Sequence, residues 1–372
     1  MENNKIKFAI IGLGNIGMRH AEYILKNSNA LLVDVCDNSS KYQDISSKMQ
    51  DARHKIKDVI KDGKIEIQNQ QINFYNCIEE LLKHTTADVI NVCTPNYLHA
   101  THTIAALNAD KHVVCEKPMS TSLVDAEAMI AASQKNNKTI FVVKQNRYNP
   151  PVQQVKKLIT ENKLGKILLV NINCFWNRNE HYYNSNWRGD KMKDGGCLYT
   201  QFSHFVDILY YLCGYSTPIY SLMQNNIHAY NTIEDNGICL LQTADGGLVN
   251  FNFSICSYEK NMEGAITIIA ENGTVKIGGQ YLNTIEYQYI KDILLPPINI
   301  TAKNNDYGLY QGSMSNHDKM IDNVINTLHG TDTIMTNAQE GRDVVKMIEE
   351  MYNLVIVKSN HQINTSLNHQ IN

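Results

Sequence analysis

The chain has 372 residues, of which 43% are hydrophobic and 19% are charged, values that exclude collagen-like and disordered classes. This length exceeds the size at which one hydrophobic core usually keeps growing, so two domains are expected. The 34 basic and 37 acidic residues give a net charge of -3 without a long run of like charge. We therefore expect no binding to nucleic acid or to a membrane surface.

Nine cysteines are scattered along the chain without a Cys-x-x-Cys pair, and most of them lie in apolar runs. This pattern is typical of buried free thiols in a reducing compartment and predicts neither a disulfide framework nor a metal site. The first apolar run, residues 8–11, is too short for a signal peptide, and no stretch approaches the ~18 apolar residues of a membrane span. We therefore expect a cytoplasmic protein.

Short apolar runs alternate with helical periodicity through the first 145 residues, which is the pattern of a parallel sheet with crossover helices. The expected strands cover residues 7–11, 31–36, 89–93, 111–115 and 139–143. The expected helices cover residues 16–26, 77–83, 97–108 and 123–136, the last opening with a capping-box pattern at Ser122 and Asp125. The polar segment 39–71 is interpreted as an inserted helix and loop.

The first expected strand leads directly into a G-x-G-x-x-G motif that opens a helix. Gly12 permits a tight turn, Gly14 lets the backbone approach a pyrophosphate, and Gly17 lets the helix lie close to the sheet. The free N–H groups at Asn15 and Ile16, where the helix starts, supply an anion site. Residues 1–145 are therefore predicted to form an α/β Rossmann domain that binds a dinucleotide.

The second expected strand ends at Asp37, 20 residues after Gly17, where a carboxylate can accept hydrogen bonds from ribose hydroxyls. Asp37 would repel a 2′-phosphate, and the next residues, 38–40, contain no arginine to hold one. Lys41 is the only nearby cation. NAD is therefore favoured over NADP, the alternative being that Asp37 only caps the following helix.

The composition changes after two prolines at positions 150 and 151. One expected helix, residues 152–163, is followed by long alternating strands such as residues 166–174. Asp245-Gly246 and Asn272-Gly273 each separate two alternating runs, and both dipeptides are strong hairpin signals. Residues 146–358 are therefore predicted to form an α+β domain with a large, mostly antiparallel open sheet, closed by helices over 315–328 and 338–357. The tail, residues 359–372, is expected to be disordered.

Two other expected strands of the first domain end in polar segments, Cys-Thr-Pro-Asn-Tyr-Leu-His from residue 93 and Glu-Lys-Pro from residue 116. Ligands bind at this edge of parallel sheets. With the glycine motif, these segments resemble the glucose-fructose oxidoreductase, inositol dehydrogenase and rhizopine-catabolism protein (Gfo/Idh/MocA) family of two-domain sugar and polyol dehydrogenases. The resemblance extends over nearly the whole chain.

The resemblance implies a role for each residue of these segments. Residues implied to contact the dinucleotide are Thr94, Pro95, Asn96, His99, Glu116 and Lys117, together with Trp187 and Arg188 of the second domain. Lys117 is also implied to reach the reacting hydroxyl and to precede a cis peptide bond. A second subunit is implied to cover the antiparallel sheet, giving a homodimer or a homotetramer.

Residues 194–207 resemble the glycine-rich turn and helix of the family, but Thr200 stands where the family usually has an aspartate. A catalytic set of Lys, Asp and His therefore cannot be assumed. Helical spacing places Thr200, His204, Asp207 and Tyr211 on one polar stripe, which is usually a solvated face. Because histidine titrates near neutral pH, His204 is interpreted as the base and Lys117 as a hydrogen-bond donor to the same oxygen. The motif leaves open which of the two accepts the proton.

The segment 176–193 is basic and aromatic, which suits a substrate with a carboxylate or a diphosphate, the alternative being an ordinary exposed loop. The predicted substrate-binding residues are Arg147, Tyr148, Arg178, Thr200 and His204. Several segments are similar to family members from surface-polysaccharide gene sets, including dehydrogenases that act at C3 of UDP-N-acetylglucosamine-derived uronic acids. The resemblance therefore implies an NAD-dependent nucleotide-sugar 3-dehydrogenase. A free-sugar or inositol dehydrogenase, a sugar ketoreductase and a non-enzymatic NAD or sugar sensor remain as alternatives.

Overall fold

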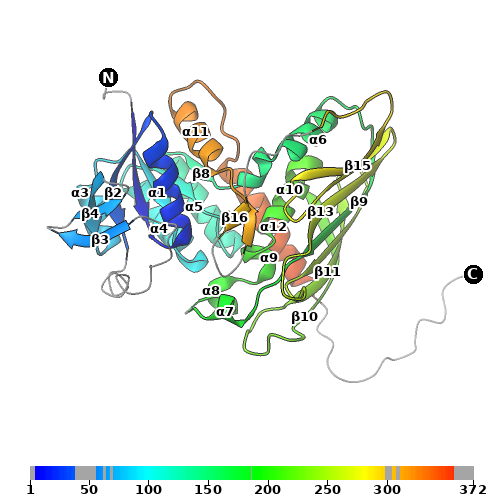
Figure 1. The fold of residues 1–372 in the computed structure, drawn as a ribbon, viewed down its shortest axis with the longest axis horizontal. Coiled ribbons are helices and arrows are strands. Elements are labelled where there is room, and N and C mark those ends of the chain that lie inside the picture. Colours follow the sequence, from blue (N-terminus) through cyan, green and yellow to red (C-terminus); the bar gives the residue numbers. More distant parts are fainter. Residues whose placement is uncertain are drawn as a thin grey trace, which may run out of the picture.

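The computed structural model describes residues 5–37, 56–61, 64–67, 70–185, 187–297, 304–306 and 311–355. These residues form two lobes, each built around one large sheet (Figure 1). Among the described helices, none has both the length and the apolar character that crossing a membrane would require. The predicted tail, residues 359–372, lies outside the described residues.

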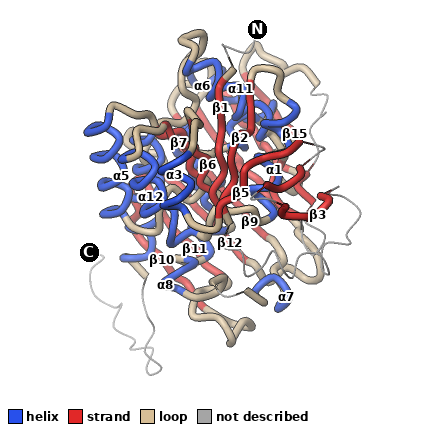
Figure 2. Tube along the Cα trace, turned by 90° about the vertical axis from the view of Figure 1, so that its left-hand side faces the viewer, coloured by secondary structure: helices blue, strands red, loops and turns tan. Residues whose placement is uncertain are grey.

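The first lobe contains an eight-stranded sheet whose centre is parallel. Its parallel strands are β1 (Ile6–Ile11), β2 (Ala30–Cys36), β5 (Gln70–Tyr75), β6 (Val89–Val92), β7 (His112–Cys115) and β8 (Ile140–Val142). Its helices are α1 (Asn15–Lys26), α3 (Ile78–His84), α4 (His99–Asn108) and α5 (Leu123–Asn136). Figure 2 shows β7, β6, β1 and β2 side by side. The central strands are fully buried, as in β1, where Phe8 and Ile10 have no exposed surface, and this burial explains their continuous apolar sequences.

The interpretation of segment 39–71 as a helix and loop is wrong in its described part. Strands β3 (Ile56–Lys61) and β4 (Lys64–Ile67) form antiparallel pairs that extend the sheet in the order β3-β4-β5-β2-β1-β6-β7-β8. Ile65 and Ile67 alternate with polar residues and are 1% and 2% exposed. This period of two determines the structure despite the polar composition. Residues 38–55, including those expected to lack an arginine for a 2′-phosphate, lie outside the described residues.

The second lobe contains a seven-stranded sheet in the order β10-β11-β12-β9-β13-β14-β15. Its strands are β9 (Ile167–Phe175), β10 (Ser216–Gln224), β11 (Asn236–Thr243), β12 (Leu248–Ser254), β13 (Glu263–Ala270), β14 (Gly273–Gly278) and β15 (Thr284–Ile290). Both predicted hairpins are confirmed, since β11 pairs antiparallel with β12 and β13 with β14. Only the pairing of β9 with β12 is parallel among these strands. The predicted fold class, a Rossmann domain followed by a mostly antiparallel open sheet, is confirmed.

Helices fill the space between the two sheets. The longer helices of the second half of the chain are α6 (Pro150–Thr160), α10 (Ser203–Cys213), α11 (His317–Leu328) and α12 (Ala338–Asn353), of which α11 packs on α1 of the first lobe. The short elements are η3 (Asn96–Leu98), η4 (Gln145–Tyr148), α7 (Glu180–Tyr183), α8 (Lys191–Asp194), α9 (Cys197–Thr200), β16 (Asn304–Asp306) and β17 (Gln311–Met314). Figure 1 shows α10 and α12 between the sheets, and α12 packs on β8 and α5 of one lobe and on β10 of the other. One apolar core therefore runs from β6 and β7 through these helices to β9 and β12.

A buried ion pair holds η4, the segment that connects the two lobes, on the helices of the second lobe. The Arg147 guanidinium donates to both carboxylate oxygens of Asp207 on α10, at 3.0 and 2.8 Å. It also donates to Glu340 of α12 at 3.1 Å and to the Met335 carbonyl at 3.0 Å. Arg147 has no exposed surface and Asp207 is 1% exposed, so the pair is shielded from water. It fixes η4 against α10 and α12.

Replacing Asp207 with alanine should lower the free energy of unfolding by about 3–5 kcal/mol, because a buried guanidinium then loses its main counter-charge. Urea unfolding at neutral pH measures this loss. The control is Lys157→Ala on α6, whose ion pair with Glu161 spans 3.8 Å at the surface and should contribute less than about 1 kcal/mol. Equal, small effects of both substitutions would contradict a stabilising role for the buried pair.

Candidate active site

The turn between β1 and α1 has the geometry of a dinucleotide-binding loop. Gly12 has φ +93°, and a Cβ there would lie 2.8 Å from the Cys93 carbonyl oxygen. A Cβ on Gly17 would lie 1.8 Å from the Gly12 carbonyl oxygen, so α1 approaches the turn at a distance that only glycine permits. A Cβ on Gly14 would have nothing within 4 Å, so the space in front of the loop is open. The loop thus fits a pyrophosphate against the first N–H groups of α1.

Asp37 lies beside this loop at the end of β2. Its Oδ2 accepts a hydrogen bond from the Leu13 N–H at 2.5 Å. This contact holds the carboxylate beside the glycine turn, where the ribose of a dinucleotide is expected. The helix that Asp37 was alternatively expected to cap falls within residues 38–55, outside the described residues.

His99 and Asn96 connect the loops around the predicted cofactor site. The His99 ring nitrogens lie 2.6 Å from the Pro118 carbonyl oxygen and 2.8 Å from that of Thr94, so the ring bridges the loops after β6 and β7. Burial lowers the pKa of His99. The Asn96 amide donates to the Asp194 carbonyl at 2.9 Å and to the Thr200 hydroxyl at 2.7 Å. Asn96 thus joins the first lobe to the second, and the cofactor contacts expected of these residues, and of Pro95, stay predictions.

Glu116 is held by two histidines that the sequence did not point to. His20 Nε2 on α1 lies 2.9 Å from the Glu116 carboxylate, and His317 Nε2 at the start of α11 lies 3.6 Å from the same oxygen. Burial disfavours the charge on Glu116, but the contacts with His20 and His317 outweigh it and hold the pKa of this carboxyl well below its usual range. The other oxygen accepts from the Lys117 N–H at 3.1 Å. Glu116 therefore stays ionised and fixes the backbone at the catalytic candidate.

Lys117 reaches across to the second lobe. The predicted cis peptide bond before Pro118 is confirmed, and the Lys117 Nζ donates to the Thr200 carbonyl at 2.8 Å. Burial lowers the pKa of Lys117 to about 8. Glu116 partly opposes this shift, whereas the positive charges of Lys144, Arg178 and Arg188 add to it. Lys144 is only 3% exposed, and the sequence did not single it out, because no neighbouring residue indicates that a lysine after β8 is buried.

His204 lies on α10, close enough to Lys117 for the two charges to interact. The histidine is 4% exposed, and burial, followed by the charges of Lys117 and Lys144, lowers its pKa well below the usual value. Its imidazole is therefore neutral at physiological pH. The structure thus brings together the two predicted catalytic residues, one from each lobe.

The predicted polar stripe is divided between two helices, since Thr200 ends α9 whereas His204 and Asp207 lie on α10, and none of the three is solvated. Thr200, His204 and Asp207 are 7%, 4% and 1% exposed. Thr200 contacts Lys117 and Asp194, whereas Asp207 binds Arg147. The stripe therefore divides between the candidate site and the ion pair that holds η4.

The basic and aromatic segment 176–193 is packed at Trp176, Arg178 and Tyr182 and exposed at His181 and Lys191. The Arg178 guanidinium lies 5.0 Å from the centre of the Trp176 ring and 5.2 Å from that of Tyr182. Arg188 stacks on the same Tyr182 ring at 4.5 Å and on Trp187 at 5.2 Å. Trp176, Arg178 and Tyr182 are 2%, 3% and 6% exposed, which contradicts the alternative of an ordinary loop. The segment therefore fixes two guanidinium groups near Lys117.

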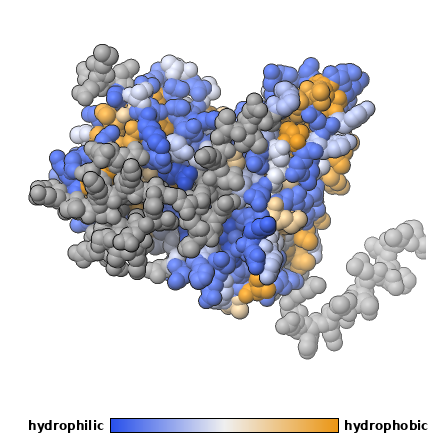
Figure 3. Space-filling model, in the orientation of Figure 1, coloured by the Kyte–Doolittle hydropathy of each residue, from blue (hydrophilic) through white to orange (hydrophobic). Residues whose placement is uncertain are grey.

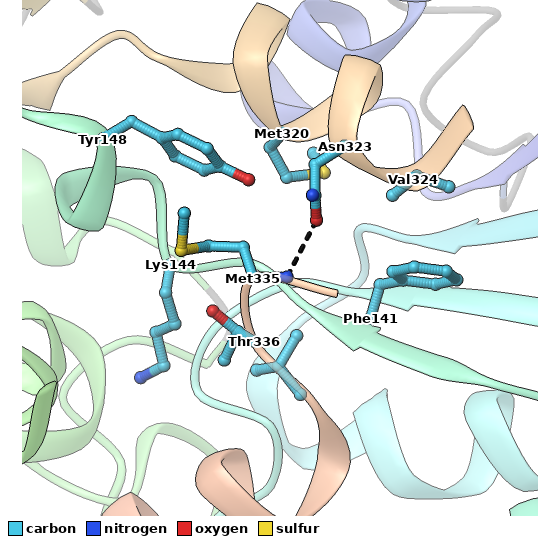
Figure 4. A pocket seen from close by; sticks show the side chains of 9 residues that line it. Phe141, Lys144, Tyr148, Met320, Asn323, Val324, Met335 and Thr336 are labelled. Carbon is cyan, nitrogen blue, oxygen red and sulfur yellow. Dashed lines mark hydrogen bonds between the residues drawn. The ribbon is translucent and has the colours of Figure 1, made fainter. Parts of the chain in front are cut away.

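Two predicted substrate-binding residues lie elsewhere. The prediction for Arg147 is wrong, because its guanidinium is fully buried against Asp207 and Glu340, partners 60 and 193 residues away that local sequence does not reveal. Tyr148 lines a cavity of about 10 Å³, which holds at most one water molecule (Figure 4). The cavity is lined by Phe141, Val142, Lys144, Tyr148, Met320, Asn323, Val324, Met335 and Thr336, and Tyr148 alone among them was predicted to bind substrate. Tyr148 also lines a second cavity, of about 430 Å³, beside α11, and its contact with substrate stays a prediction.

Comparison with known proteins gives consistent results for both lobes. Residues 6–144 match the family model described as oxidoreductase family, NAD-binding Rossmann fold, and residues 152–276 match the GFO/IDH/MocA C-terminal domain. The chain is 26% identical over 259 residues to inositol 2-dehydrogenase of Salmonella typhimurium, covering 68% of each chain. It is 22% identical over 368 residues to D-glucoside 3-dehydrogenase of Escherichia coli, covering 95% of this chain and 96% of the other.

Two solved structures resemble nearly the whole chain. The WlbA dehydrogenase from Bordetella pertussis in complex with NADH and UDP-GlcNAcA is 30% identical, with a TM-score of 0.78, covering 94% of this chain and 96% of that one. The WlbA dehydrogenase from Chromobacterium violaceum, in complex with the same two ligands, is 30% identical with a TM-score of 0.78, covering 95% and 94%.

Replacing Asp37 with alanine should weaken NAD binding by roughly 10- to 100-fold, since hydrogen bonds from ribose hydroxyls to a carboxylate are lost. NADP binding should weaken less or improve, because repulsion of its 2′-phosphate is removed. Titration calorimetry with both dinucleotides measures the ratio of the two dissociation constants. Asp37→Asn, which keeps the shape, should give an intermediate ratio, and a ratio unchanged in both variants would contradict the role of Asp37.

Proposed function

Since the chain belongs to the Gfo/Idh/MocA family of NAD-dependent oxidoreductases acting on sugar hydroxyls, we propose that it oxidises the C3 hydroxyl of UDP-GlcNAcA or a closely related UDP-N-acetylglucosamine-derived uronic acid. The observation that carries this proposal is the group of cations around the reaction centre. Arg178, Arg188 and Lys144 all act on the charge of Lys117. Such a group of positive charges favours an anionic substrate.

Charge balance distinguishes the two main candidate substrates. The carboxylates near Lys117 are Glu116, which already interacts with His20 and His317, and Asp194, which interacts with Arg188. The three cations that act on Lys117 outnumber these carboxylates and need further negative charge. A uronate carboxylate and a diphosphate provide it, and guanidinium groups bind both as paired hydrogen-bond acceptors. A free sugar or inositol is neutral and would leave these cations uncompensated.

The comparisons support the same choice. The two structures that contain UDP-GlcNAcA align over at least 94% of this chain at 30% identity. The inositol 2-dehydrogenases are 26% identical over 68% of it, which makes a free polyol the second candidate substrate.

In the mechanism that we propose, Lys117 rather than His204 accepts the hydroxyl proton. Bound NAD would accept the hydride from the sugar carbon, and the protein would orient and deprotonate the substrate. A pKa of about 8 makes the neutral amine of Lys117 roughly 300-fold more abundant near neutral pH than that of an ordinary lysine. The lowered pKa of His204 makes its imidazole a weak base but leaves it able to donate a hydrogen bond. This proposal reverses the roles that the sequence suggested.

The contact between Lys117 and Thr200 suits this role. One N–H of Lys117 is bonded to the Thr200 carbonyl at 2.8 Å, which fixes the direction of the nitrogen. In the neutral amine, the lone pair remains available to a substrate hydroxyl. His204 would bind the same oxygen and stabilise the negative charge that develops there.

A panel of substrates tests the proposed activity by absorbance of the reduced cofactor at ~340 nm, with protein and NAD at comparable concentrations so that a single turnover is visible. UDP-GlcNAcA should be oxidised at least about 100-fold more efficiently than UDP-N-acetylglucosamine, which lacks the carboxylate that the arginines bind. Inositol and glucose should react more slowly still. Efficient oxidation of inositol without reaction of any UDP-sugar would contradict the proposal.

The dependence of kcat/KM on pH tests the proton acceptor. Because the lysine must be neutral to act as a base, kcat/KM should rise about tenfold per unit below pH ~8 and level off above it. Lys117→Met should lower kcat by about 100- to 10,000-fold without changing the affinity for NAD. His204→Asn should lower kcat less and keep the rising limb. A kcat/KM that falls as pH rises through 8 would contradict Lys117 as the base.

We also propose that the second sheet packs against another copy of the chain, as a homodimer or homotetramer. On β11, Ile238 and Leu240 are 49% and 44% exposed, whereas Cys239 between them is fully buried against the helices. Other exposed apolar residues of this sheet include Leu248, Ile269, Tyr287 and Tyr289. Figure 3 shows hydrophobic patches along this side of the molecule.

Light scattering should give a mass of at least two chains, and a monomer would contradict this proposal.

We propose the cytoplasm as the compartment. All nine cysteines are free thiols in the structure, and Cys174 on β9 is separated from Cys239 on β11 by strand β12. Free thiols are typical of a reducing compartment.

A further inference from the structure

We propose that Asp194 is a positioning residue for Lys117, because its carboxylate, acting through Thr200, supplies the negative charge that the family usually carries at position 200. The inference rests on the proposed function for its catalytic meaning. The contacts on which it depends are independent of the substrate.

Asp194 is a fully buried carboxylate with both oxygens hydrogen-bonded. Its Oδ1 accepts from the Thr200 hydroxyl, and its Oδ2 accepts from the Gly189 N–H at 2.7 Å. Burying a carboxylate is costly unless hydrogen bonds satisfy it, and here they do. An asparagine has the same shape, and its oxygen could accept from the Gly189 N–H while its amide faces the Thr200 hydroxyl. That hydroxyl could then donate to the main-chain carbonyl of residue 194, which lies 3.2 Å away, so folding alone does not require a charge at this position.

Thr200 links this carboxylate to the catalytic candidate. Its hydroxyl donates to Asp194 and accepts from the Asn96 amide at 2.7 Å. Its carbonyl accepts from the Lys117 Nζ at 2.8 Å. Asn96 also donates to the Asp194 carbonyl at 2.9 Å, which closes the network. One residue therefore separates the Asp194 carboxylate from the Lys117 ammonium.

The electrostatics agree with this geometry. Burial raises the pKa of Asp194 to about 6, and the hydrogen bonds from Thr200 and Gly189 and the charges of Arg188 and Lys117 prevent a larger rise. The carboxyl is therefore mostly ionised at pH 7 and above. Because a Coulomb interaction is mutual, its charge stabilises the ammonium form of Lys117.

The other charged and titratable groups around this network come from both lobes. Those facing Lys117 are Glu116, Lys144, Arg178, Arg188 and His204. Those facing Asp194 are Tyr183, Arg188, Cys197 and Glu234. The cations outnumber the carboxylates around Lys117, so loss of Asp194 would destabilise the ammonium form of Lys117.

The test measures the protonation of Lys117 without any substrate. Reductive methylation modifies only the neutral amine, and peptide mass spectrometry follows its rate at Lys117 from pH 6 to 10, with the exposed Lys157 as internal reference. The midpoint is the pH at which Lys117 is methylated at half its maximal rate. In Asp194→Asn this midpoint should fall by about one pH unit relative to wild type. The matched control is Asp190→Asn, which changes a carboxylate at the other end of α8 and should leave the midpoint unchanged.

Three further variants separate charge from structure. Thr200→Ser keeps the hydroxyl and should match wild type, whereas Thr200→Val should shift the midpoint less than Asp194→Asn does. The double variant Asp194→Asn with Thr200→Asp returns a carboxylate to position 200 and should restore the wild-type midpoint. If Asp194→Asn does not fold, Thr200→Val decides the question, because it removes the hydroxyl link and leaves Asp194 in place. An unchanged midpoint in Thr200→Val would then overturn a role that acts through Thr200.

The results distinguish this inference from the proposed function. A folded Asp194→Asn variant with the wild-type midpoint would overturn the role of Asp194, whatever the substrate. A shifted midpoint in a protein that does not oxidise UDP-GlcNAcA would support the role of Asp194 and contradict the proposed substrate. When the midpoint of methylation shifts and UDP-GlcNAcA is oxidised, the rising limb of kcat/KM in Asp194→Asn should move to lower pH by the same amount as that midpoint.

Discussion

The hydrogen bond between Lys117 Nζ and the Thr200 carbonyl, at 2.8 Å, is the contact on which the candidate site depends. It joins a strand end of the Rossmann lobe to a short helix of the second lobe, so neither lobe can form the site alone. The Asn96 amide on Thr200 and Asp194 is a second contact between the lobes, and the buried Arg147–Asp207 pair holds the connecting segment η4 on α10. The apolar core that runs through α10 and α12 gives these polar contacts a rigid frame.

Burial and charge then determine the chemistry of the site. Burial lowers the pKa values of both Lys117 and His204, and the positive charge of Lys117 lowers that of His204 further. Glu116 remains ionised because His20 and His317 contact its carboxylate. A lysine that releases its proton near neutral pH, surrounded by fixed cations, fits the oxidation of an anionic sugar better than that of a neutral one.

The sequence predicted those features that local patterns determine. Parallel strands, both hairpins, the glycine loop and the Glu116–Pro118 segment follow from periodicity, turn residues and motif, and the structure agrees with each. Features that depend on partners far apart in the chain were missed. Arg147 looked like a ligand-binding residue because Asp207 and Glu340 lie 60 and 193 residues away. Thr200 in place of the family aspartate suggested an incomplete catalytic set, because the sequence does not show that Thr200 binds the buried Asp194.

The transfer of deuterium from labelled substrate tests the central claim most directly. UDP-GlcNAcA labelled with deuterium at C3 or at C4 is incubated with the protein and NAD, and mass spectrometry then analyses the reduced cofactor. The account predicts that deuterium reaches the cofactor from C3 alone. Deuterium from C4, or reduced cofactor that carries none from either position, would contradict it.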